Sequence, residues 1–408
     1  MSVLRGKKIV LGISGGIAAY KTASLVRLFI KAGAEVQVIM TPASLDFVTP
    51  LTLATLSKRP VYSTIYNQPD PALQEDHPTW NKHVELALWA DFMLIAPATA
   101  NTLAKMAHGN CDNLLMAVYL SAKCPVYVAP AMDLDMYKHP TTLTNFAALQ
   151  AFGHKIIPAE SGELASGLSG EGRMAEPENI LAFMEADLAN QLPLTGKTVL
   201  ITAGPTFEAI DPVRFIGNHS TGKMGFDIAK AALAKGAQVI LVSGPTHLDL
   251  QDSKCKLVRV TSAAQMHAAC QEQFEHVDVV ICAAAVADYR PKVVSAQKMK
   301  KKDDDLQIEL EKTVDILATL GNAKTHQVVV GFALETENEI EHAIVKIQKK
   351  NLDLIVLNSL RDAGAGFGTA TNKVTFIDQA LQCTSLPLQS KEAVADDLLT
   401  TIIAKFYA

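Results

Sequence analysis

The feature that most constrains this chain is a strand–glycine–helix–strand pattern that occurs once in each half of its 408 residues. The first copy spans Lys7–Thr41 and the second spans Gly196–Gly244. Each copy begins with an apolar run short enough for a buried strand, breaks at small residues, continues with helical periodicity and closes on a second β-rich run. Because that order is typical of a βαβ unit, the repeat predicts two nucleotide- or phosphate-handling domains.

Composition narrows the class of protein further. A hydrophobic content of 49% and a charged content of 19% are typical of a soluble α/β protein with two full cores. The net charge of −5 gives no electrostatic support for a nucleic-acid partner. No apolar run reaches the length of about 18 residues that a membrane span needs, and the first strand begins too early for a signal peptide. The six cysteines lack metal-ligand spacing, so we expect reduced thiols in a cytoplasmic protein.

Strand and helix patterns alternate through both halves, which predicts a doubly wound, Rossmann-like sheet in each. We expect one domain at residues 1–190 and another at 191–408, with Gln191–Gly196 as the linker. In the first half, the glycine- and serine-rich segment Glu160–Arg173 is predicted to be a mobile loop. In the second half, Lys298–Asp305 is predicted to be a charged loop.

The segment Gly217–Lys223 (GNHSTGK) differs from a Walker A loop in two ways. Met224 occupies the position of the magnesium-binding Ser or Thr, and the segment does not follow its strand directly. One interpretation is a helix start capped by Ser220 or Thr221. The other, which we favour, is an anion site at the helix N-terminus. The polar residues that cluster there are Arg214, Asn218, His219 and Lys223.

Two further segments of the second half suggest nucleotide chemistry. Asp288 follows a predicted strand, where it could contact magnesium or ribose or simply cap a loop. The lysines of Lys298–Asp305 could form a solvated surface, or they could neutralise a triphosphate as a closing loop.

Long motifs then reveal a family resemblance. The stretches TAGPTFEAIDPVRFIGNHSTGKMG, AAAVADYRP, GFALETEN and KKNLDLIVLN resemble phosphopantothenate–cysteine ligase, and the first half resembles phosphopantothenoylcysteine decarboxylase. Over essentially its whole length the chain resembles the fused, bifunctional coenzyme A biosynthesis protein of bacteria. The resemblance implies that the carboxylate of 4'-phosphopantothenate attacks CTP to give an acyl-cytidylate. Cysteine then displaces CMP, and the product is decarboxylated.

For the ligase, the resemblance implies that Asn218 holds the acyl-cytidylate, that Arg214 lies near the pantothenate and phosphate groups, and that Lys298 serves the coupling to cysteine. It also implies that Asp288 contacts the nucleotide and Mg²⁺. The expected nucleotide- or substrate-binding set is Arg214, Lys223, Asp288, Phe332, Lys346 and Lys350, with Lys223 added from the anion-site hypothesis. One departure is Lys312-Thr313-Val314-Asp315, where relatives commonly carry an Asn-Pro-Asp turn.

For the decarboxylase, the turn Ser14-Gly15-Gly16 opens a helix, and helix starts receive phosphates through their backbone amides. The resemblance implies that this turn holds the phosphate of FMN. The other residues expected to contact FMN are Thr41, Ala98, Thr99, Asn101 and Met132, with Asp112-Asn113 in the same lining. A lone histidine near a helix start is ordinarily a surface or capping residue, but the resemblance makes His83 the active-site base. A helix N-terminus would favour its neutral form.

Two departures leave the decarboxylase open to two interpretations. Asp133 replaces the asparagine expected to hold the substrate carboxylate, and Ser166 replaces the cysteine of the substrate clamp that protonates the intermediate. Either the chain is a working variant that uses a protonated Asp133 or another donor, or its first half is a flavin-binding scaffold of impaired activity. We favour the working variant. The resemblance also implies a homo-oligomer built from trimers, up to a dodecamer.

Overall fold

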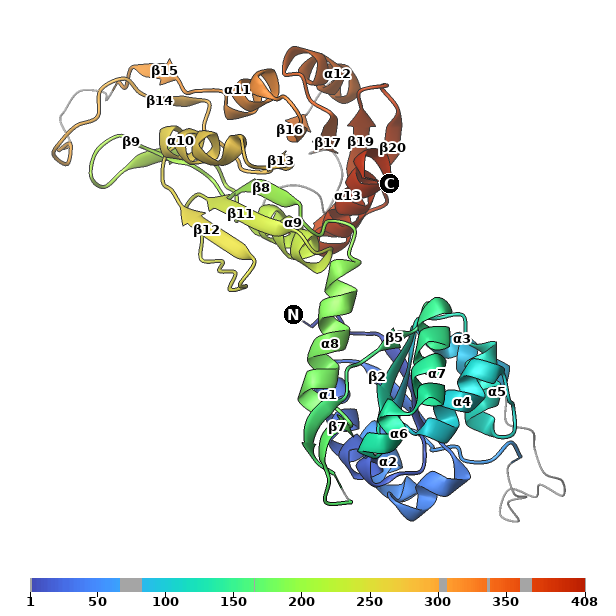
Figure 1. The fold of residues 1–408 in the computed structure, drawn as a ribbon. Helices are drawn as coiled ribbons and strands as arrows, with labels where there is room; N and C mark the ends of the chain where they lie inside the picture. Colours follow the sequence, from blue (N-terminus) through green and yellow to red (C-terminus); the bar gives the residue numbers. More distant parts are fainter. Residues whose placement is uncertain are drawn as a thin grey trace, which may run out of the picture. The chain divides into compact units, whose positions relative to one another are not determined.

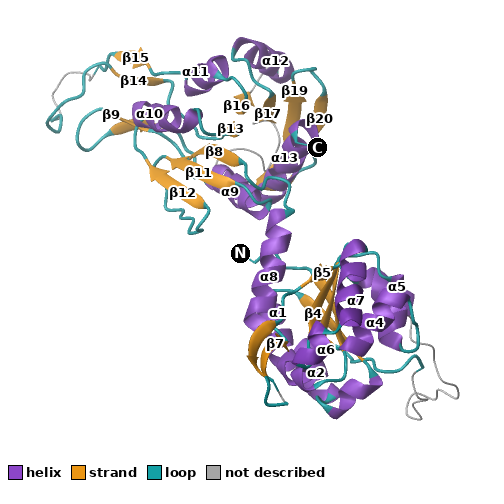
Figure 2. Ribbon diagram, viewed as in Figure 1, coloured by secondary structure: helices purple, strands orange, loops and turns teal. Residues whose placement is uncertain are grey.

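The computed structural model describes residues 2–66, 83–164, 166–300, 307–335, 338–359 and 369–407. These residues form two compact units, Met1–Ala189 and Asn190–Ala408, which are coloured blue to green and green to red in Figure 1. Each unit contains one large sheet with helices packed against it (Figure 2). The expected α/β fold class, with a doubly wound sheet in each half, is confirmed.

The first unit is built on a five-stranded sheet in the order β2-β1-β3-β4-β5, in which every pair is parallel. The strands are β1 (Lys8–Ile13), β2 (Glu35–Met40), β3 (Phe92–Ala98), β4 (Val126–Pro130) and β5 (Lys155–Ile156). The helices are α1 (Thr22–Lys31), α2 (Pro50–Ser57), α3 (His83–Trp89), α4 (Ala100–His108), α5 (Leu114–Ser121), α6 (Leu134–Lys138), α7 (Pro140–Ala151) and α8 (Pro177–Asn190). Short 3₁₀ turns occupy Ile17–Lys21 and Pro42–Asp46.

The apolar runs become buried strands because both faces of this sheet are covered. Ile9 and Leu11 of β1 belong to one hydrophobic cluster, whereas Val10 belongs to the cluster on the opposite face. A parallel strand buried on both faces needs a continuous apolar run rather than an alternating one. The pattern in the sequence therefore placed β1 correctly.

The second unit has an eight-stranded sheet in the order β12-β11-β8-β13-β16-β17-β19-β20. Its strands are β8 (Thr198–Ala203), β11 (Gln238–Ser243), β12 (Cys255–Arg259), β13 (Val279–Cys282), β16 (Val328–Glu335), β17 (Leu354–Ser359), β19 (Val374–Asp378) and β20 (Cys383–Ser385). Its helices are α9 (Lys223–Ala234), α10 (Ala263–Phe274), α11 (Ile316–Ala323), α12 (Glu339–Lys349) and α13 (Lys391–Phe406).

The sheet of this unit is parallel except at one edge. β19 pairs antiparallel with both β17 and β20. A parallel neighbour needs a crossover connection, usually a helix. The described residues between β17 and β19 contain only the short strand β18 (Thr371–Asn372), which pairs with β21 (Gln389–Ser390).

The structure contains three further short antiparallel strand pairs that the sequence analysis did not predict. The predicted mobile loop Glu160–Arg173 is wrong in its secondary structure, because it forms the antiparallel strands β6 (Glu160–Glu163) and β7 (Ser169–Arg173). In the second unit, β9 (Phe207–Ala209) pairs with β10 (Phe215–Gly217), and β14 (Tyr289–Pro291) pairs with β15 (Leu310–Lys312). Of the predicted charged loop, residues 301–305 lie outside the described residues.

Candidate active sites

A cavity of about 940 Å³ lies at the carboxyl ends of the strands in the first unit. The segments after β1, β2, β3 and β4 line it together with the β6–β7 hairpin. Open parallel sheets bind ligands at this edge, where the strand order reverses between β1 and β3. Of the residues predicted to bind FMN, those lining the cavity are Gly15, Gly16, Thr41, Thr99, Asn101 and Met132. Asp112 and Asn113 also line it, as expected.

Ser14 supports the turn after β1 from inside the protein. Its hydroxyl donates to the carbonyl oxygen of Pro97 over 2.6 Å and accepts from the N–H of Thr99 over 3.0 Å. The turns after β1 and β3 are therefore tied to each other. Ser14 and Ala98 were predicted to contact FMN, but both are buried and neither is among the residues that line the cavity.

Thr41 presents a polar atom that the described protein leaves without a partner. The residue is 8% exposed, and its Oγ1 is buried with no hydrogen bond among the described residues. Native proteins pair nearly all buried hydroxyls, because an unpaired one costs free energy. Since Thr41 lines the cavity, a bound molecule with a hydrogen-bonding edge fits this position.

The β6–β7 hairpin packs on the turn after β4 through Gly172. The N–H of Met132 donates to the Gly172 carbonyl oxygen over 3.0 Å. Gly172 has a φ of 138°, which favours glycine, and a Cβ there would collide with the Met132 carbonyl oxygen. Ser166 lies at the exposed turn of this hairpin, where its Oγ accepts from the N–H of Leu168 over 3.4 Å, and it does not line the cavity.

A buried lysine joins the hairpin to the turn after β1. Lys21 is 5% exposed, and its Nζ donates to the Met174 carbonyl oxygen over 2.8 Å and pairs with Glu176 over 3.0 Å. Arg173 pairs with the same carboxylate over 2.7 Å. These bonds, that of Lys21 above all, lower the pKa of Glu176. Sequence reasoning missed this network because its members are far apart in the chain.

Asp133 lines the cavity and also caps a helix. Its Oδ1 accepts from the N–H of Leu134 over 2.6 Å at the start of α6. His83 is the first residue of α3, whose main contacts are with α5. No described residue of α3 lines the cavity, so in one copy of the chain His83 lies outside the lining to which Asp133 belongs.

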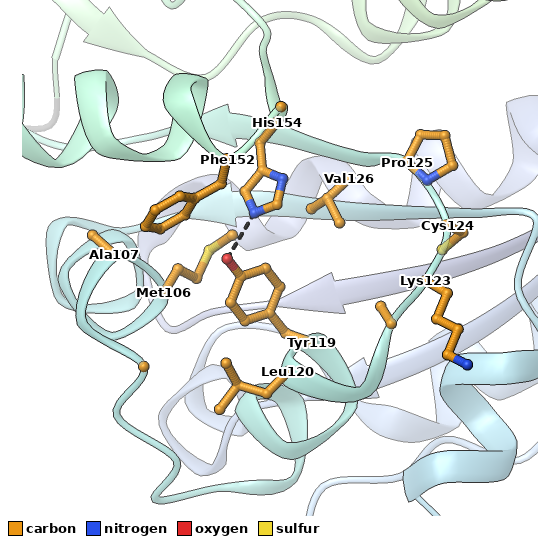
Figure 3. Close-up of a pocket in the computed structure, with 13 residues that line it drawn as sticks. Met106, Ala107, Tyr119, Leu120, Lys123, Cys124, Pro125, Val126, Phe152 and His154 are labelled. Carbon is orange, nitrogen blue, oxygen red and sulfur yellow. Dashed lines mark hydrogen bonds between the residues drawn. The ribbon is translucent and has the colours of Figure 1, made fainter.

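A second cavity of about 610 Å³ in the first unit contains none of the predicted residues. It lies where α4, α5 and α7 end, and Figure 3 shows Tyr119 and His154 pointing toward each other in its wall. The Tyr119 hydroxyl and His154 Nε2 are hydrogen-bonded over 2.7 Å. Burial raises the pKa of Tyr119 and lowers that of His154, so the pair is held in its neutral form.

The second unit has a cavity of about 510 Å³ at the carboxyl ends of β8, β13 and β16. The residues predicted to bind nucleotide that line it are Asp288, Phe332, Lys346 and Lys350. They come from a loop, a strand and a helix that are far apart in sequence. The predicted residues therefore bring two lysines, a carboxylate and an aromatic ring to one hollow, whose lining also includes Tyr289, Lys312 and Asp315. Such a set suits a magnesium-bound nucleotide.

The departure at residues 312–315 preserves the wall of this cavity. Thr313 donates its hydroxyl to the Ala287 carbonyl oxygen over 2.6 Å and its N–H to that of Asp288 over 3.0 Å. Asp315 caps α11 by accepting from Ala318 N–H over 3.0 Å and pairs with Lys350 over 2.8 Å. Burial alone would raise the pKa of Asp315, but the hydrogen bond from Lys350 and the cap lower it. The ion pair therefore keeps the Asp315 carboxylate ionised.

Asn218 and Arg214 lie outside the lining of this cavity but connect to its loops. The Asn218 amide donates to the carbonyl oxygens of Ala285 and Val286, each over 3.1 Å, just before Asp288. Arg214 pairs with Asp211 over 2.9 Å and donates to the Met299 carbonyl oxygen over 2.5 Å, beside the exposed Lys298.

Lys223 is placed differently from the anion-site hypothesis. Its Nζ pairs with the buried Asp227 over 2.7 Å and with Glu392 over 3.3 Å, and it does not line the cavity. Burial alone would lower the pKa of Lys223, but the bond to Asp227 raises it. The alternative interpretation, a helix start capped by Ser220 or Thr221, is wrong, because the N-cap of α9 is Gly222, with a φ of 82° and no side-chain cap.

The described residues lack two kinds of feature. They contain no group of three or more His, Cys, Asp or Glu side chains arranged to hold a metal ion. None of the helices they form is both long and apolar enough to cross a membrane.

Comparisons with known proteins agree with this division into two units. Residues 2–189 match the family model "Flavoprotein", and residues 194–406 match "DNA/pantothenate metabolism flavoprotein C-terminal domain". The chain is 45% identical to "Coenzyme A biosynthesis bifunctional protein CoaBC" of Bacillus subtilis (strain 168) over 404 residues, which cover 98% of each protein. It is 50% identical over 361 residues to a "Cysteine/Cysteine sulfinic acid decarboxylase" of an unknown prokaryotic organism, covering 87% of this chain and 99% of that protein.

Among solved structures, one match is the crystal structure of the C-terminal domain of a coenzyme A biosynthesis bifunctional protein CoaBC. It is 45% identical, covers 52% of this chain and 97% of the solved chain, and has a TM-score of 0.45.

Proposed function

The chain belongs to the family of coenzyme A biosynthesis bifunctional proteins, and from this membership we propose how its two cavities divide the work. It is a phosphopantothenate–cysteine ligase and a phosphopantothenoylcysteine decarboxylase in one chain. The observation that carries the proposal is that residues named from the motifs converge on one cavity in each unit. The comparisons do not favour the alternative in which the first half is only a scaffold.

The cavity of the second unit binds CTP. Lys346 and Lys350 place positive charge at the triphosphate, and the ring of Phe332 offers a surface for the base. Asp288 would hold Mg²⁺ together with phosphate oxygens and water, because Mg²⁺ needs only one or two protein carboxylates when a nucleotide supplies the rest. The donor set fits: the described lining has the carboxylate of Asp288 and that of Asp315, which is paired with Lys350, but no cage of protein ligands.

The ligation then proceeds in two displacements. A carboxylate oxygen of 4'-phosphopantothenate bonds to the α-phosphorus, and the bond to pyrophosphate breaks. The cysteine nitrogen next bonds to the acyl carbon, the bond to CMP breaks and the amine releases a proton. Asn218, fixed by its bonds to two carbonyls beside Asp288, is placed to orient the acyl-cytidylate, and Lys298 serves the second displacement.

The cavity of the first unit binds FMN, and two observations support that fit. The Thr41 hydroxyl has no hydrogen-bond partner in the described part of the chain, and Gly15 and Gly16 leave the backbone at a helix start open to a phosphate. FMN supplies the two-electron oxidation of the substrate thiol that lets its carboxylate leave as CO₂, and then the return of those electrons. The network of Lys21, Glu176 and Arg173 holds the β6–β7 hairpin, which contains the position of the substrate clamp, beside the turn after β1.

His83 is proposed as the base of the decarboxylase, supplied by a neighbouring copy. No described residue of α3 lines the cavity of the same chain, so a homo-oligomer is the arrangement in which His83 can reach the substrate. A trimer, assembled further into a dodecamer, is the form we propose. Asp133, held as the cap of α6, lines the cavity where it would meet the substrate carboxylate.

Single-turnover reactions of the ligase test these roles. Asn218→Ala should still form the acyl-cytidylate from 4'-phosphopantothenate and CTP but use it poorly. Lys298→Gln should accumulate the acyl-cytidylate and fail to couple cysteine. Radiolabelled CTP and quenched-flow sampling separate the two steps. If both variants turn over normally, the ligase-site assignment is wrong.

A further inference from the structure

Asp211 is a buried carboxylate at the turn between β9 and β10. Its side chain has no exposed surface. Its Oδ1 accepts from the N–H groups of Val213 and Arg214, each over 2.8 Å. Its Oδ2 accepts from the N–H of Met299 over 3.1 Å and pairs with the Arg214 guanidinium over 2.9 Å. A carboxylate with this many donors is satisfied although it is buried.

The same contacts hold the main chain of Met299 at both its N–H and its carbonyl oxygen. Arg214 donates to the Met299 carbonyl oxygen over 2.5 Å, while Asp211 accepts from the Met299 N–H. The N–H of Ser295 donates to the carbonyl oxygen of Ile210 over 3.0 Å, which adds a second tie between the two segments. The turn that carries Arg214 and the segment that carries Lys298 therefore form one hydrogen-bonded unit.

The charge state of Asp211 agrees with this geometry. Burial alone would raise its pKa, but the three backbone N–H donors and the charge of Arg214 lower it. The carboxylate is therefore ionised near pH 7.

We propose that Asp211 is a positioning residue for the coupling step, because it joins the turn of Arg214 to the peptide beside Lys298 and so fixes these two side chains relative to each other. The inference rests on the proposed function, which gives Lys298 its part in the second displacement. Asp211 itself touches neither nucleotide nor cysteine; it acts through the segment that it holds.

The test is Asp211→Asn in the full-length protein. The asparagine keeps an oxygen for the N–H groups of the turn but lacks the charge and the second acceptor for Met299. Formation of the acyl-cytidylate should stay within ~3-fold of wild type, whereas its consumption by cysteine should slow by roughly 10- to 100-fold, the effect of losing a charge-assisted hydrogen bond. Trypsin should also cleave after Lys298 or Lys300 faster than in wild type.

The matched control is Asp378→Asn. Asp378 is another little-exposed carboxylate of the same unit, paired with Lys405 over 2.6 Å and accepting from the N–H of Gln382 over 2.9 Å. The Asp378→Asn variant should lower the melting temperature without changing the ratio between the rates of acyl-cytidylate formation and coupling to cysteine. If Asp211→Asn slows both steps equally, or behaves like Asp378→Asn, the positioning role is refuted.

Lys298→Gln, measured in parallel, separates the inference from the proposed function. If Lys298→Gln couples cysteine normally, the role of Lys298 is what fails. If Lys298→Gln blocks coupling while Asp211→Asn couples at the wild-type rate, the inference about Asp211 fails. Should Asp211→Asn be insoluble, Met299→Pro removes the N–H that Oδ2 accepts while Asp211 stays; it should slow coupling selectively, and normal coupling would overturn the proposal.

Discussion

Replacing Gly15 with alanine should weaken the binding of FMN without abolishing the fold. A Cβ at this position would lie 2.7 Å from both the Cβ and the carbonyl oxygen of Ala43 and 2.8 Å from its carbonyl carbon. Two of these three atoms belong to the backbone after β2, which cannot rotate away as a side chain can. The segment that contains Ala43 lines the cavity, so it must move out of place to admit the methyl group.

The size of the effect follows from the cost of overpacking. Forcing a methyl group into a filled site costs about 1–3 kcal/mol. If bound FMN requires the native position of the turn, this cost appears in the dissociation constant as a roughly 5- to 160-fold weaker affinity. Gly12→Ala is the matched control in β1, the strand before this turn, because its Cβ would meet the flexible end of Leu115 inside the core rather than the cavity wall.

Titration of apoprotein with FMN, followed by flavin fluorescence, measures the affinity, and thermal unfolding measures stability. Gly12→Ala should lower the melting temperature by ~2–4 °C per kcal/mol lost while binding FMN as wild type does. Gly15→Ala should bind FMN at least ~5-fold more weakly. Wild-type affinity in Gly15→Ala would refute the assignment of this turn to the flavin.

Three further predictions address individual side chains. Asp133→Asn keeps the helix cap, because asparagine caps as well as aspartate, but removes a negative charge that would meet the substrate carboxylate. The KM for phosphopantothenoylcysteine should therefore fall by ~5-fold. Loss of turnover instead would make Asp133 the proton donor. His83→Asn should bind FMN yet release no CO₂. Mixing it with Gly15→Ala subunits should restore part of the activity if the site is shared between copies. Activity in the unmixed His83→Asn protein would remove His83 from the base role. Burial alone would raise the pKa of Asp278, but the hydrogen bond from Lys197 lowers it. The ionised Asp278 carboxylate therefore contributes fully to stability above the ordinary carboxyl pKa, and this contribution is lost as the pH falls below about 4. Urea unfolding of Asp278→Asn should therefore show lower stability near pH 7 and a weaker loss on acidification, and an unchanged acid profile would contradict this.

The sequence predicted those parts of the site that local patterns encode. The turn Ser14-Gly15-Gly16 follows a fully apolar strand, so its place at the carboxyl edge follows from the βαβ pattern alone. Phe332 lies in a strand of the second sheet and lines its cavity, but the sequence named it only through the motif resemblance. For Lys346 and Lys350 the motif resemblance was needed, because helical periodicity does not tell which cavity a helix faces.

What the sequence did not predict depends on pairing over long distances. Lys21 meets Glu176 and Asp211 meets Met299 only because separate segments fold together, and no local spacing encodes either contact. The three-residue strands β9 and β10 are too short for their alternation to be distinguished from a loop. The antiparallel edge at β19 was missed because an apolar run gives no direction relative to its neighbours.

The most direct test of the central claim is to give the purified protein phosphopantothenoylcysteine and to measure CO₂ and the mass of the product, with free cysteine offered in parallel. The account predicts one CO₂ per 4'-phosphopantetheine formed and no comparable release from free cysteine. A product lacking two hydrogens would mean that reduction fails, and would point to Ser166 in place of the clamp cysteine. Bound FMN with no release of CO₂ would contradict the account and leave the first unit as a scaffold for the ligase.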